Sequence, residues 1–519
     1  MPSATWWACY AVWAAGTVGV ALRINAAVSE PYMDEIFHVP QAQAYCDGDW
    51  AYWDGALTTP PGLYLFPALV AAVHRLLTRI LPLASLLPLN PCSLPSLRAF
   101  NLLLSLALPF LYISIAHLLS PLPPPSSTKG QQAESKSPAR RSLHWEALII
   151  ALFPLVNWWS WLFYTDLASL ISVLLCWREG LKGKYCRSAF VGAASLWFRQ
   201  TNIVWLAFVG GQAVISKSKQ SASPAVHDPF LSSASSGALF RTPFSLVETV
   251  LRQPLSIIPV LAYYLPVFAA AGAFVKWNGG IVLGDKQNHV ATLHVPQLYY
   301  FVGFAAAFFA PQILSVGSVK RAVRGLAGSI SRVTASMVTL VGMCWTIKRF
   351  TIAHPFLLAD NRHYAFYLWR RVINVHPFAR YALAPGYLLA GRLLFDSLAQ
   401  AGTMSFSTFL LFAGATTAVL VPTPLIEPRY FIIPLIILRL YLIPSSSSSP
   451  SGTSASARSQ RRRALRLFLE AALYLAVQAV CVYLFLEKPF FWDVKIGEDG
   501  KGLEGRDERE VGRRQRFMW

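Results

Sequence analysis

The chain has 519 residues, of which 55% are hydrophobic and only 13% are charged, against roughly 25% charged residues in a soluble domain. A mean hydropathy of +0.44 over the whole length excludes a soluble body with a single anchor and predicts many membrane spans. The net charge of +20 would suit a nucleic-acid-binding protein, but the Lys and Arg residues lie between apolar segments, where they orient a membrane protein. We therefore expect no nucleic-acid partner.

The predicted elements are apolar helices, the first from Trp6 to Leu22 and the last from Leu465 to Phe485. The first segment has no basic residue before it and no convincing cleavage site, so we interpret it as a retained span and not as a signal peptide. We expect an all-α polytopic membrane protein with about thirteen transmembrane helices, formed by a single domain over residues 1–519. Segments rich in Pro or Ser predict cytosolic linkers near 120–143, 216–240 and 444–463.

The distribution of charge predicts the topology. No Lys or Arg lies between Arg23 and Arg75, whereas six Asp or Glu residues do, so the first loop is predicted to be lumenal. The pair Arg370 and Arg371 fits this topology less well, because it would be lumenal. Five stretches with four basic residues each are predicted to be cytosolic: 129–141, 178–187, 217–252, 320–332 and 458–463.

The apolar segment from Leu63 to Leu81 conflicts with this topology if it crosses the membrane. An odd number of spans must separate the lumenal first loop from the cytosolic linker near 120–143, and two apolar segments lie there. The first contains Pro67, His74, Arg75 and Arg79. We therefore predict that Leu63 to Leu81 lies along the lumenal interface without crossing, as amphipathic helices do.

Six polar, aromatic-rich segments fall on the lumenal side of this topology, where they could form one composite active site. None of them was used to assign the basic loops. They are 30–64, 163–166, 197–202, 279–297, 358–367 and 427–431.

The adjacent carboxylates Asp34 and Glu35 are the best candidates for acid–base chemistry. A carboxylate within hydrogen-bond reach of a sugar hydroxyl can take its proton while that oxygen attacks an anomeric carbon. Two neighbouring carboxylates would also repel each other and raise the pKa of one of them. A solvated acidic loop without catalytic function is the simpler alternative. Asp166, which follows an aromatic segment at membrane depth, is a second candidate carboxylate, or a helix-end residue at the interface.

Four basic side chains in separate lumenal loops could bind a lipid-linked phosphate, because Arg offers paired donors that match phosphate oxygens. Anchoring at the interface is the alternative. They are Arg199, Lys286, Arg362 and Arg429.

The histidines His289, His294 and His363 lack the tight i, i+3 or i+4 spacing of a metal site, so we favour hydrogen bonds to sugar or phosphate and expect no metal. Oxygen ligands from Asp34, Glu35 and Asp285 remain the alternative.

The seven cysteines show no paired spacing, so the sequence predicts neither a zinc site nor a disulfide framework. The segment from Glu487 to Trp519 mixes both signs of charge and is predicted to be a solvated tail.

Taken together, the motifs closely resemble the endoplasmic-reticulum alpha-1,2-glucosyltransferase family, which adds the last glucose to the dolichol-linked precursor of N-glycosylation. The resemblance follows the motif order over nearly the whole chain and excludes only the Pro/Ser-rich linkers. The matching motifs are YMDEIFHVPQAQAYC, TTPPGLY, FRQTN, GDKQNHVATLHVPQLYYF, LADNRHYAFYLWRRV, EPRYFIIP and RFMW.

The resemblance implies a GT-C type membrane enzyme in the endoplasmic reticulum. Its donor would be dolichyl phosphate glucose, its acceptor the diglucosylated nine-mannose dolichyl-diphosphate oligosaccharide, and it would need no cofactor. A beta-linked donor and an alpha-linked product imply inversion by one displacement with a general base. Related enzymes place that base in the first lumenal loop, which points to Asp34 and then Glu35. Asp166 stands where Glu is expected in close relatives.

Two other functions stay open at this point. A mannosyl transferase of the same superfamily is separated from a glucosyltransferase only by the resemblance, and a transporter of lipid-linked sugars would show an inverted repeat that we do not find. We assign to substrate binding Arg98 and the polar residues of the motifs: His38, Gln41, Asp166, Arg199, Gln200, Asn202, Asp285, Lys286, His289, His294, Gln297, Asp360, Asn361, Arg362, His363, Tyr364, Glu427, Arg429 and Tyr430.

Overall fold

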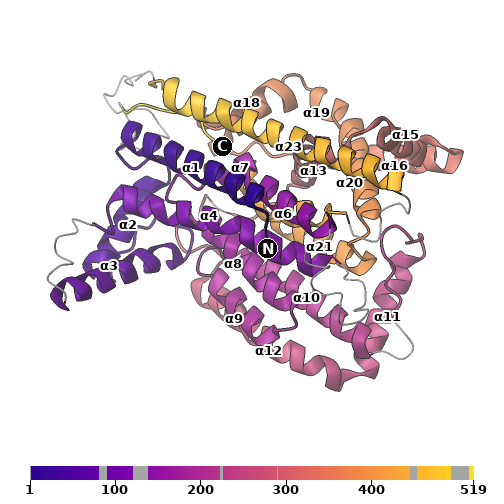
Figure 1. Ribbon diagram of the computed structural model, residues 1–519, viewed down its shortest axis with the longest axis horizontal. Coiled ribbons are helices and arrows are strands. Elements are labelled where there is room, and N and C mark those ends of the chain that lie inside the picture. The colour runs from indigo at the N-terminus through magenta and orange to yellow at the C-terminus, as the bar shows by residue number, and fades with distance from the viewer. Residues whose placement is uncertain are drawn as a thin grey trace. The chain divides into compact units, whose positions relative to one another are not determined.

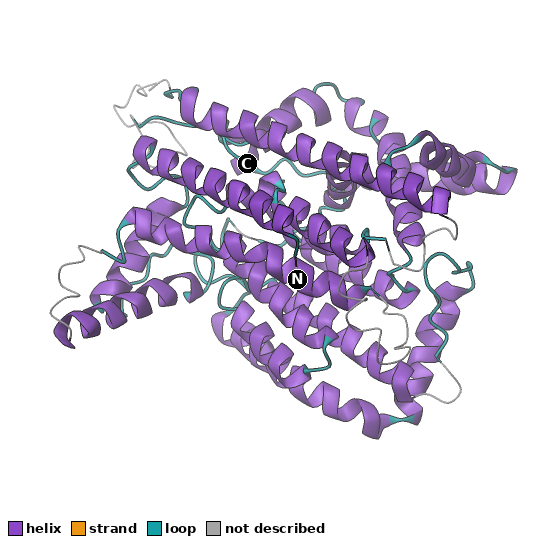
Figure 2. Ribbon diagram, in the orientation of Figure 1, coloured by secondary structure: helices purple, strands orange, loops and turns teal. Residues whose placement is uncertain are grey.

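A computed structural model describes residues 2–80, 90–120, 138–221, 226–288, 290–444, 453–492 and 513–519. Within these ranges the chain is helical, and the only extended pairings are three isolated bridges (Figure 2). This confirms the predicted all-α class.

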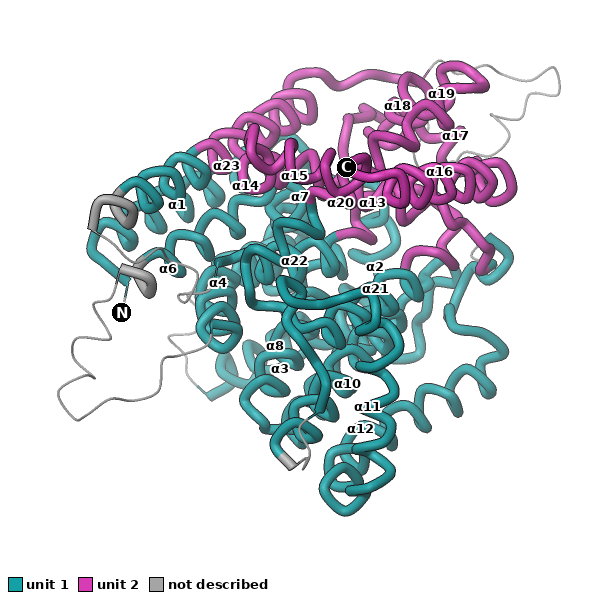
Figure 3. The backbone as a smooth tube through the Cα atoms, turned by 90° about the vertical axis from the view of Figure 1, so that its right-hand side faces the viewer, with its two compact units in different colours: residues 1–290, 394–419, 432–468 teal, residues 291–393, 420–431, 469–519 magenta. Residues whose placement is uncertain are grey.

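The chain divides into two compact units, coloured separately in Figure 3. Unit 1 contains residues 1–290, 394–419 and 432–468, and unit 2 contains residues 291–393, 420–431 and 469–519. Two long helices contribute residues to both units. They are α20 (Ala384–Ala401) and α23 (Thr453–Glu487).

Unit 1 holds the N-terminal half of the chain and two helices from its C-terminal part (Figure 1). Its helices are α1 (Ala4–Ala27), α2 (Glu35–Asp47), α3 (Gly62–Ile80), α4 (Leu94–Leu119), α6 (Pro138–Ala151), α7 (Pro154–Trp158), α8 (Asp166–Leu181), α9 (Tyr185–Ser195), α10 (Asn202–Ser221), α11 (Ala238–Arg252), α12 (Pro254–Asn278), α21 (Phe406–Leu420) and α22 (Ile432–Tyr441).

The centre of unit 1 is formed by α8, which packs against α4, α9 and α10. Every residue from Asp166 to Trp177 is buried except Ile171 and Leu175. A helix that is apolar on nearly all faces is expected to lie inside its bundle. Residues 163–165, which lead into α8, are buried as well.

Buried charges in unit 1 occur with partners. Glu146 of α6 is 1% exposed and accepts from Arg439 at 2.6 Å and from Arg463 at 3.0 Å. Such pairing is required because an isolated buried charge is costly. The arrangement joins α6, α22 and the start of α23.

Unit 2 contains the long, largely exposed α16, parts of α20 and α23, and a set of shorter elements. Apart from α20 and α23, these elements are α13 (Gln297–Phe308), α14 (Ala310–Ile313), α15 (Val316–Ala327), α16 (Ile330–Phe350), α17 (Pro355–Ala359), α18 (Tyr364–Leu368), the π-helical η2 (Trp369–Ile373), α19 (Ala379–Ala382) and the 3-10 turn η3 (Pro428–Phe431).

Six helices in the described part of the chain are long and apolar enough to cross a membrane: α1, α3, α4, α12, α16 and residues 458–487 of α23. The protein is therefore a multi-pass membrane protein. The count of thirteen crossings stays a prediction, because helices such as α8 and α9 are shorter than a full span.

A disulfide between Cys46 and Cys92 overturns the expectation that the cysteines do not pair. The two residues are 46 positions apart, so no short spacing revealed them. A signal was nevertheless present, because Cys46 lies in the predicted lumenal loop and Cys92 follows a segment predicted not to cross.

The disulfide also bears on the position of α3, which lies between its two cysteines. A single crossing would place Cys46 and Cys92 on opposite sides of a hydrocarbon core of about 30 Å. Their Cα atoms are 6.5 Å apart. This proximity supports the prediction that Leu63 to Leu81 does not cross, which stays a prediction because residues 81–89 lie outside the described part of the chain. Length and composition alone would count α3 as a span.

The C-terminal segment is a second correction. Residues 513–519 do not form a solvated tail, because Gln515 is 2%, Arg516 4% and Met518 0% exposed. The segment packs in unit 2, where the backbones of Gln515 and Phe490 exchange two hydrogen bonds. Apolar and aromatic side chains beside the charges explain this burial.

The predicted linkers are only partly loops. Near 216–240, α10 continues to Ser221, and Asp228 accepts from Ser407 and forms an ion pair with Lys219. The linker near 120–143 falls largely outside the described residues, which resume with α6. Residues 445–452 of the linker near 444–463 also lie outside them, whereas residues 453–463 are helical and begin α23.

Candidate active site

The first loop begins with a strained turn at Met33, directly before Asp34. Met33 has φ of 56° and is 8% exposed. A left-handed conformation costs a non-glycine residue about 1–2 kcal/mol, and such strain gathers at functional sites. The backbone N–H of Asp34 donates to the hydroxyl of Tyr164 at 3.0 Å, and its carbonyl accepts from the N–H of His38 at 3.0 Å. The half-buried Asp34 carboxylate is therefore carried on a fixed backbone.

Glu35, although adjacent to Asp34, has a different environment. It is fully buried, and its oxygens accept from Arg98 at 2.6 and 2.9 Å. They also accept from the backbone N–H of Phe163 at 2.7 Å and of Tyr32 at 3.1 Å. The prediction that Asp34 and Glu35 act as two mutually repelling carboxylates is wrong, because the positive charge of Arg98 compensates the negative charge of Glu35. A carboxylate with four such donors is not placed to take a proton from a substrate.

Arg98, which we assigned to substrate binding, points into the protein and is 2% exposed. Besides Glu35, its N–H groups donate to the Asn25 side chain at 3.0 Å and to the carbonyls of Val28 at 2.8 Å and Glu30 at 3.3 Å. All five of its donors are used within unit 1. Its assignment changes from binding substrate to holding Glu35 and the end of α1.

The segment 163–166 is fixed beside Asp34 by Asn101 of α4. The Asn101 amide donates to the carbonyls of Leu162 at 2.7 Å and Tyr164 at 2.8 Å. Asp166 is 4% exposed and forms an ion pair with Arg199 at 2.9 Å. The predicted second carboxylate and the predicted phosphate ligand are thus partners of each other.

The segment 197–202 docks on the first loop. The N–H of Gly62 donates to the carbonyl of Trp197 at 2.9 Å, and a Cβ atom at Gly62 would lie 2.5 Å from that oxygen. Gln200 donates from its side chain to the carbonyl of Thr58 at 2.7 Å. The close approach explains the glycine in the TTPPGLY motif.

Residues 283–285 dock on the same loop from α12. The N–H of Leu283 donates to the carbonyl of Thr58 at 3.2 Å, and the N–H of Asp285 donates to the carbonyl of Gly55 at 3.1 Å. A Cβ atom at Gly284 would lie 2.3 Å from the Gly55 oxygen, so this position requires glycine. Asp285 itself has φ of 42°. This strained, half-buried carboxylate is held at the surface of the first loop.

The rest of this segment is exposed. The side chain of Asn288 donates to the Asp285 carboxylate at 2.7 Å, and the Lys286 ammonium donates to the backbone and side-chain oxygens of Asn278. His289 lies outside the described residues, so its assignment stays a prediction.

Three other predicted binding residues of unit 1 are buried and used in packing. His38 makes a 2.7 Å hydrogen bond with the Tyr64 hydroxyl, and Gln41 donates to the carbonyl of Tyr52 at 2.8 Å. Asn202 is 1% exposed and bonds to a serine of α8. The side chain of His38 is 7% exposed and that of Gln41 is 0% exposed. They shape the first loop from inside.

In unit 2, His294 and Gln297 hold the segment 423–425. The imidazole of His294 bonds to the Pro424 carbonyl at 3.0 Å, and Gln297 donates to the carbonyls of Thr423 at 3.2 Å and Leu425 at 2.7 Å. Burial lowers the pKa of His294 to about 4, against the smaller raising effect of the carbonyls. His294 is therefore neutral at pH 7.

Asp360, which is half-buried, and the buried Arg362 form an ion pair in the LADNRHY motif, with a shortest contact of 2.6 Å. Burial would raise the pKa of Asp360, but Arg362 and the charge of His363 outweigh it and lower that pKa. Arg362 also donates to the Gln515 side chain at 3.0 Å and lies over the Trp492 ring at 4.6 Å. The guanidinium is thus part of the packing of unit 2.

The neighbours of this pair are bound by residues near the end of the chain. Asn361 accepts from the Trp492 indole at 2.8 Å, and His363 bonds to the Trp519 carbonyl at 2.8 Å. The N–H of Tyr364 donates to the carbonyl of Met518 at 3.0 Å. The RFMW motif therefore holds the LADNRHY loop.

Glu427 and Arg429 pair with each other within the EPRYF motif. The guanidinium of Arg429 lies 5.8 Å from the centre of the Tyr430 ring. Three of the four basic side chains predicted to bind phosphate, Arg199, Arg362 and Arg429, therefore have a carboxylate partner in the structure.

Four of the six predicted segments meet within unit 1: 30–64, 163–166, 197–202 and the part of 279–297 up to 288. Segment 163–166 contacts Asp34, and the other two contact residues 55–62 of the first loop. The other two, with residues 291–297, belong to unit 2. The sequence analysis included Tyr164 only within the segment 163–166 and did not identify Asn101. The side chains of these two residues hold this site together.

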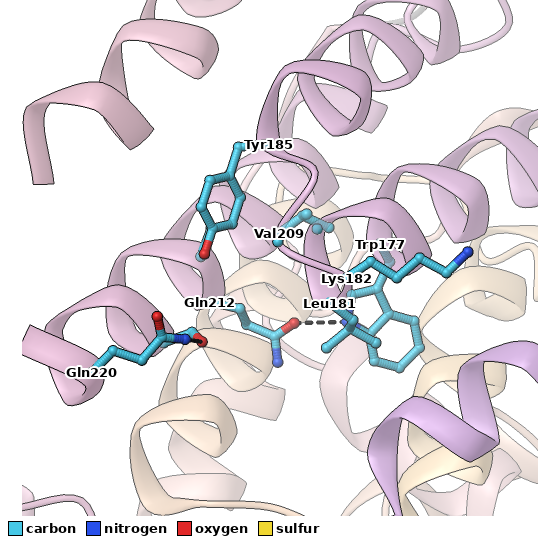
Figure 4. A pocket seen from close by; sticks show the side chains of 11 residues that line it. Trp177, Leu181, Lys182, Tyr185, Val209, Gln212 and Gln220 are labelled. Atoms are coloured by element: carbon cyan, nitrogen blue, oxygen red, sulfur yellow. Dashed lines mark hydrogen bonds between the residues drawn. The ribbon is translucent and has the colours of Figure 1, made fainter.

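A separate cavity of about 200 Å³ lies in unit 1 between α8, α9 and α10 (Figure 4). Trp177 donates to Gln212 at 2.7 Å in its wall, and Lys182, Tyr185 and Gln220 also line it. It contains none of the predicted site residues. Among the described residues no group of three or more His, Cys, Asp or Glu could hold a metal ion.

Comparison with known proteins gives a consistent result. Residues 28–440 match the model of the DIE2/ALG10 family. A relative from Arabidopsis thaliana is 31% identical, with 97% of each chain covered. One from Mus musculus is 35% identical, with 95% of this chain and 94% of the relative covered. Both are named Dol-P-Glc:Glc(2)Man(9)GlcNAc(2)-PP-Dol alpha-1,2-glucosyltransferase. No solved structure matches.

Proposed function

The chain belongs to the DIE2/ALG10 family, and on that premise we propose that it transfers glucose from dolichyl phosphate glucose to a lipid-linked oligosaccharide. The acceptor is the diglucosylated nine-mannose dolichyl-diphosphate glycan, and the new bond is alpha-1,2. The observation that carries the proposal is the 31–35% identity over at least 95% of the chain to relatives named for this reaction.

Asp34 is proposed as the general base. Its carboxylate takes the proton of the acceptor hydroxyl while that oxygen attacks the anomeric carbon, and the bond between this carbon and the phosphate oxygen breaks. The electron pair of the broken bond leaves with dolichyl phosphate, so one displacement inverts the configuration. The strained turn at Met33 and the hydrogen bond from Asp34 to Tyr164 support this role, because they hold the base in place.

The departing phosphate gains negative charge, which preorganised cations stabilise. In unit 1 the proposal assigns this task to Arg199 and Lys286. Arg199 is 16% exposed and contacts Asp166 at 2.9 Å and the Thr165 hydroxyl at 3.3 Å, and Lys286 is exposed. Asp166 then orients Arg199, a task that either Asp or Glu could perform.

We place the site on the lumenal side of the endoplasmic-reticulum membrane. The first loop has no Lys or Arg between Arg23 and Arg75, in keeping with the positive-inside rule. The Cys46–Cys92 disulfide supports the same side, because disulfides persist in the oxidising lumen and are rare in the cytosol.

A transfer assay with purified protein and a synthetic diglucosylated acceptor tests the proposal. Dolichyl phosphate glucose should give a product with one added alpha-1,2-linked glucose, and dolichyl phosphate mannose should give none. Transfer of mannose at a comparable rate would contradict the assignment of the donor.

The Asp34→Asn variant tests the base. It should be folded and inserted but inactive, because an amide cannot accept the proton. Asp47→Asn, an exposed carboxylate at the other end of α2, is the matched control and should keep wild-type turnover. If Asp34→Asn keeps more than a tenth of wild-type turnover, Asp34 is not the base.

A further inference from the structure

We propose that α2 is attached at both ends to the segment that begins α4, and that these two attachments position Asp34 for catalysis. The first attachment is the Glu35–Arg98 ion pair and the second is the Cys46–Cys92 disulfide. The inference rests on the proposed role of Asp34 as the base, and it assigns Glu35, Arg98 and the two cysteines as positioning residues.

The first attachment lies next to the base. Glu35 and Arg98 are 0% and 2% exposed, and two hydrogen bonds of 2.6 and 2.9 Å join them in a bidentate geometry. Glu35 also accepts from the N–H of Phe163 at 2.7 Å. The same carboxylate therefore connects α2, α4 and the segment whose Tyr164 receives the hydrogen bond from Asp34.

The second attachment lies one helix length away. Cys46, near the end of α2, is covalently bound to Cys92, two residues before α4 begins. Hydrogen bonds surround it: Gln43 donates to the Cys92 carbonyl at 3.1 Å, and Arg75 donates to the Cys46 carbonyl at 2.7 Å. The disulfide thus ties α2, α3 and the start of α4 together.

Two attachments are needed because α2 contains a proline. Pro40 lies between Glu35 and Cys46 and removes one backbone hydrogen bond from the helix. The attachments are separated by eleven residues, which correspond to about 16 Å of helix. A single attachment would leave a helix of this kind free to pivot and bend about it. Two attachments restrict both movements and so fix the turn that carries Asp34.

The second attachment depends on thiol oxidation. Cys46 and Cys92 together lose two protons and two electrons when their sulfur atoms bond, and the electrons reduce the disulfide of a thiol oxidoreductase to a dithiol. Before this step α2 has its ion pair and hydrogen bonds but no covalent attachment to the start of α4. We therefore expect full activity only after the loop has been oxidised.

The test compares kcat and both KM values, per folded protein, for the variants Cys46→Ser/Cys92→Ser and Glu35→Gln/Arg98→Met. The second variant removes both charges, because removal of one would leave the other buried and could prevent folding. Each should lower kcat by tenfold or more and change the two KM values by less than threefold, since a misplaced base impairs the chemical step more than binding.

Reduction and matched controls complete the experiment. Dithiothreitol should lower the kcat of the wild type to that of Cys46→Ser/Cys92→Ser and should leave that variant unchanged. Cys186→Ser, which removes an exposed free thiol, should behave as the wild type. Asp34→Asn separates the two proposals, because its activity tests the base alone. If Asp34→Asn is inactive while both double variants keep kcat within twofold of the wild type, the positioning inference is wrong and the base assignment stands.

Discussion

Replacing Gly284 with alanine is expected to detach residues 283–285 from the first loop and to reduce transfer. A Cβ atom at this position would lie 2.3 Å from the Gly55 oxygen and 2.5 Å from the Leu57 oxygen. Both are backbone atoms and cannot turn aside as a flexible side chain could. The segment must therefore move by about 1 Å to restore an ordinary contact of 3.4 Å or more.

Such a movement breaks two backbone hydrogen bonds, from Leu283 to Thr58 and from Asp285 to Gly55. Each hydrogen bond contributes about 0.5–1.5 kcal/mol, and overpacking typically costs a further ~1–3 kcal/mol. Docking of the segment is thus weakened by about 2–6 kcal/mol in total. Because displacements near 1 Å can cost about 100-fold in rate, we expect kcat/KM to fall by a factor of about 10–100.

The matched control is Gly280→Ala, in the same segment, where a Cβ atom meets nothing within 4 Å. Both variants are compared by transfer rate and by limited proteolysis of the segment 279–288. Only Gly284→Ala should lose activity and be cut faster. Equal kcat/KM values for the two variants would refute the docking of this segment as a condition for activity.

Three further predictions concern the metal, the topology and the C-terminal segment. Transfer should survive EDTA, because the sequence offers no well-spaced set of metal ligands; loss with chelator and recovery with Mn²⁺ or Mg²⁺ would contradict this. In sealed microsomes, with the free cysteines replaced, an impermeant thiol reagent should label Lys320→Cys, but Arg79→Cys only after permeabilisation; labelling of Arg79→Cys from outside would show that α3 crosses. Met518→Ala should lower the free energy of unfolding by about 2–5 kcal/mol, because this side chain is 0% exposed. The exposed Arg514→Ala is its control in a thermal-unfolding assay, and equal midpoints would argue against a packed C-terminal segment.

Several features were predictable from the sequence because their signals are local. Apolar segments of span length predict helices in a bilayer whatever they pack against, and the absence of Lys and Arg over one stretch marks a loop. The motifs identified the family because they are contiguous. The interfacial position of α3 was predicted by counting spans, and the disulfide between the residues on either side of α3 supports it.

The roles of individual site residues depended on contacts between distant segments. Asp34 and Glu35 are neighbours, yet successive residues on a helix point about 100° apart, and only Glu35 meets Arg98, 63 positions further along the chain. Composition could not show that Arg98 holds the Glu35 carboxylate. The same reason applies to Arg98, whose charge suggested a ligand site until its five donors were seen to be used inside the protein.

The Cys46–Cys92 disulfide and the burial of residues 513–519 have the same physical origin. A disulfide requires two Cα atoms within about 7 Å, a condition on distance in space and not on spacing in the sequence. The C-terminal segment reads as polar by composition, but its Met518 and Trp519 fit against Tyr364 and the aromatic side chains of α13. Local patterns therefore determined the class, the family and the position of the first loop. Which side chains hold the protein together and which remain for substrate was set by long-range packing, because the energy of each contact depends on a partner that the local sequence does not contain.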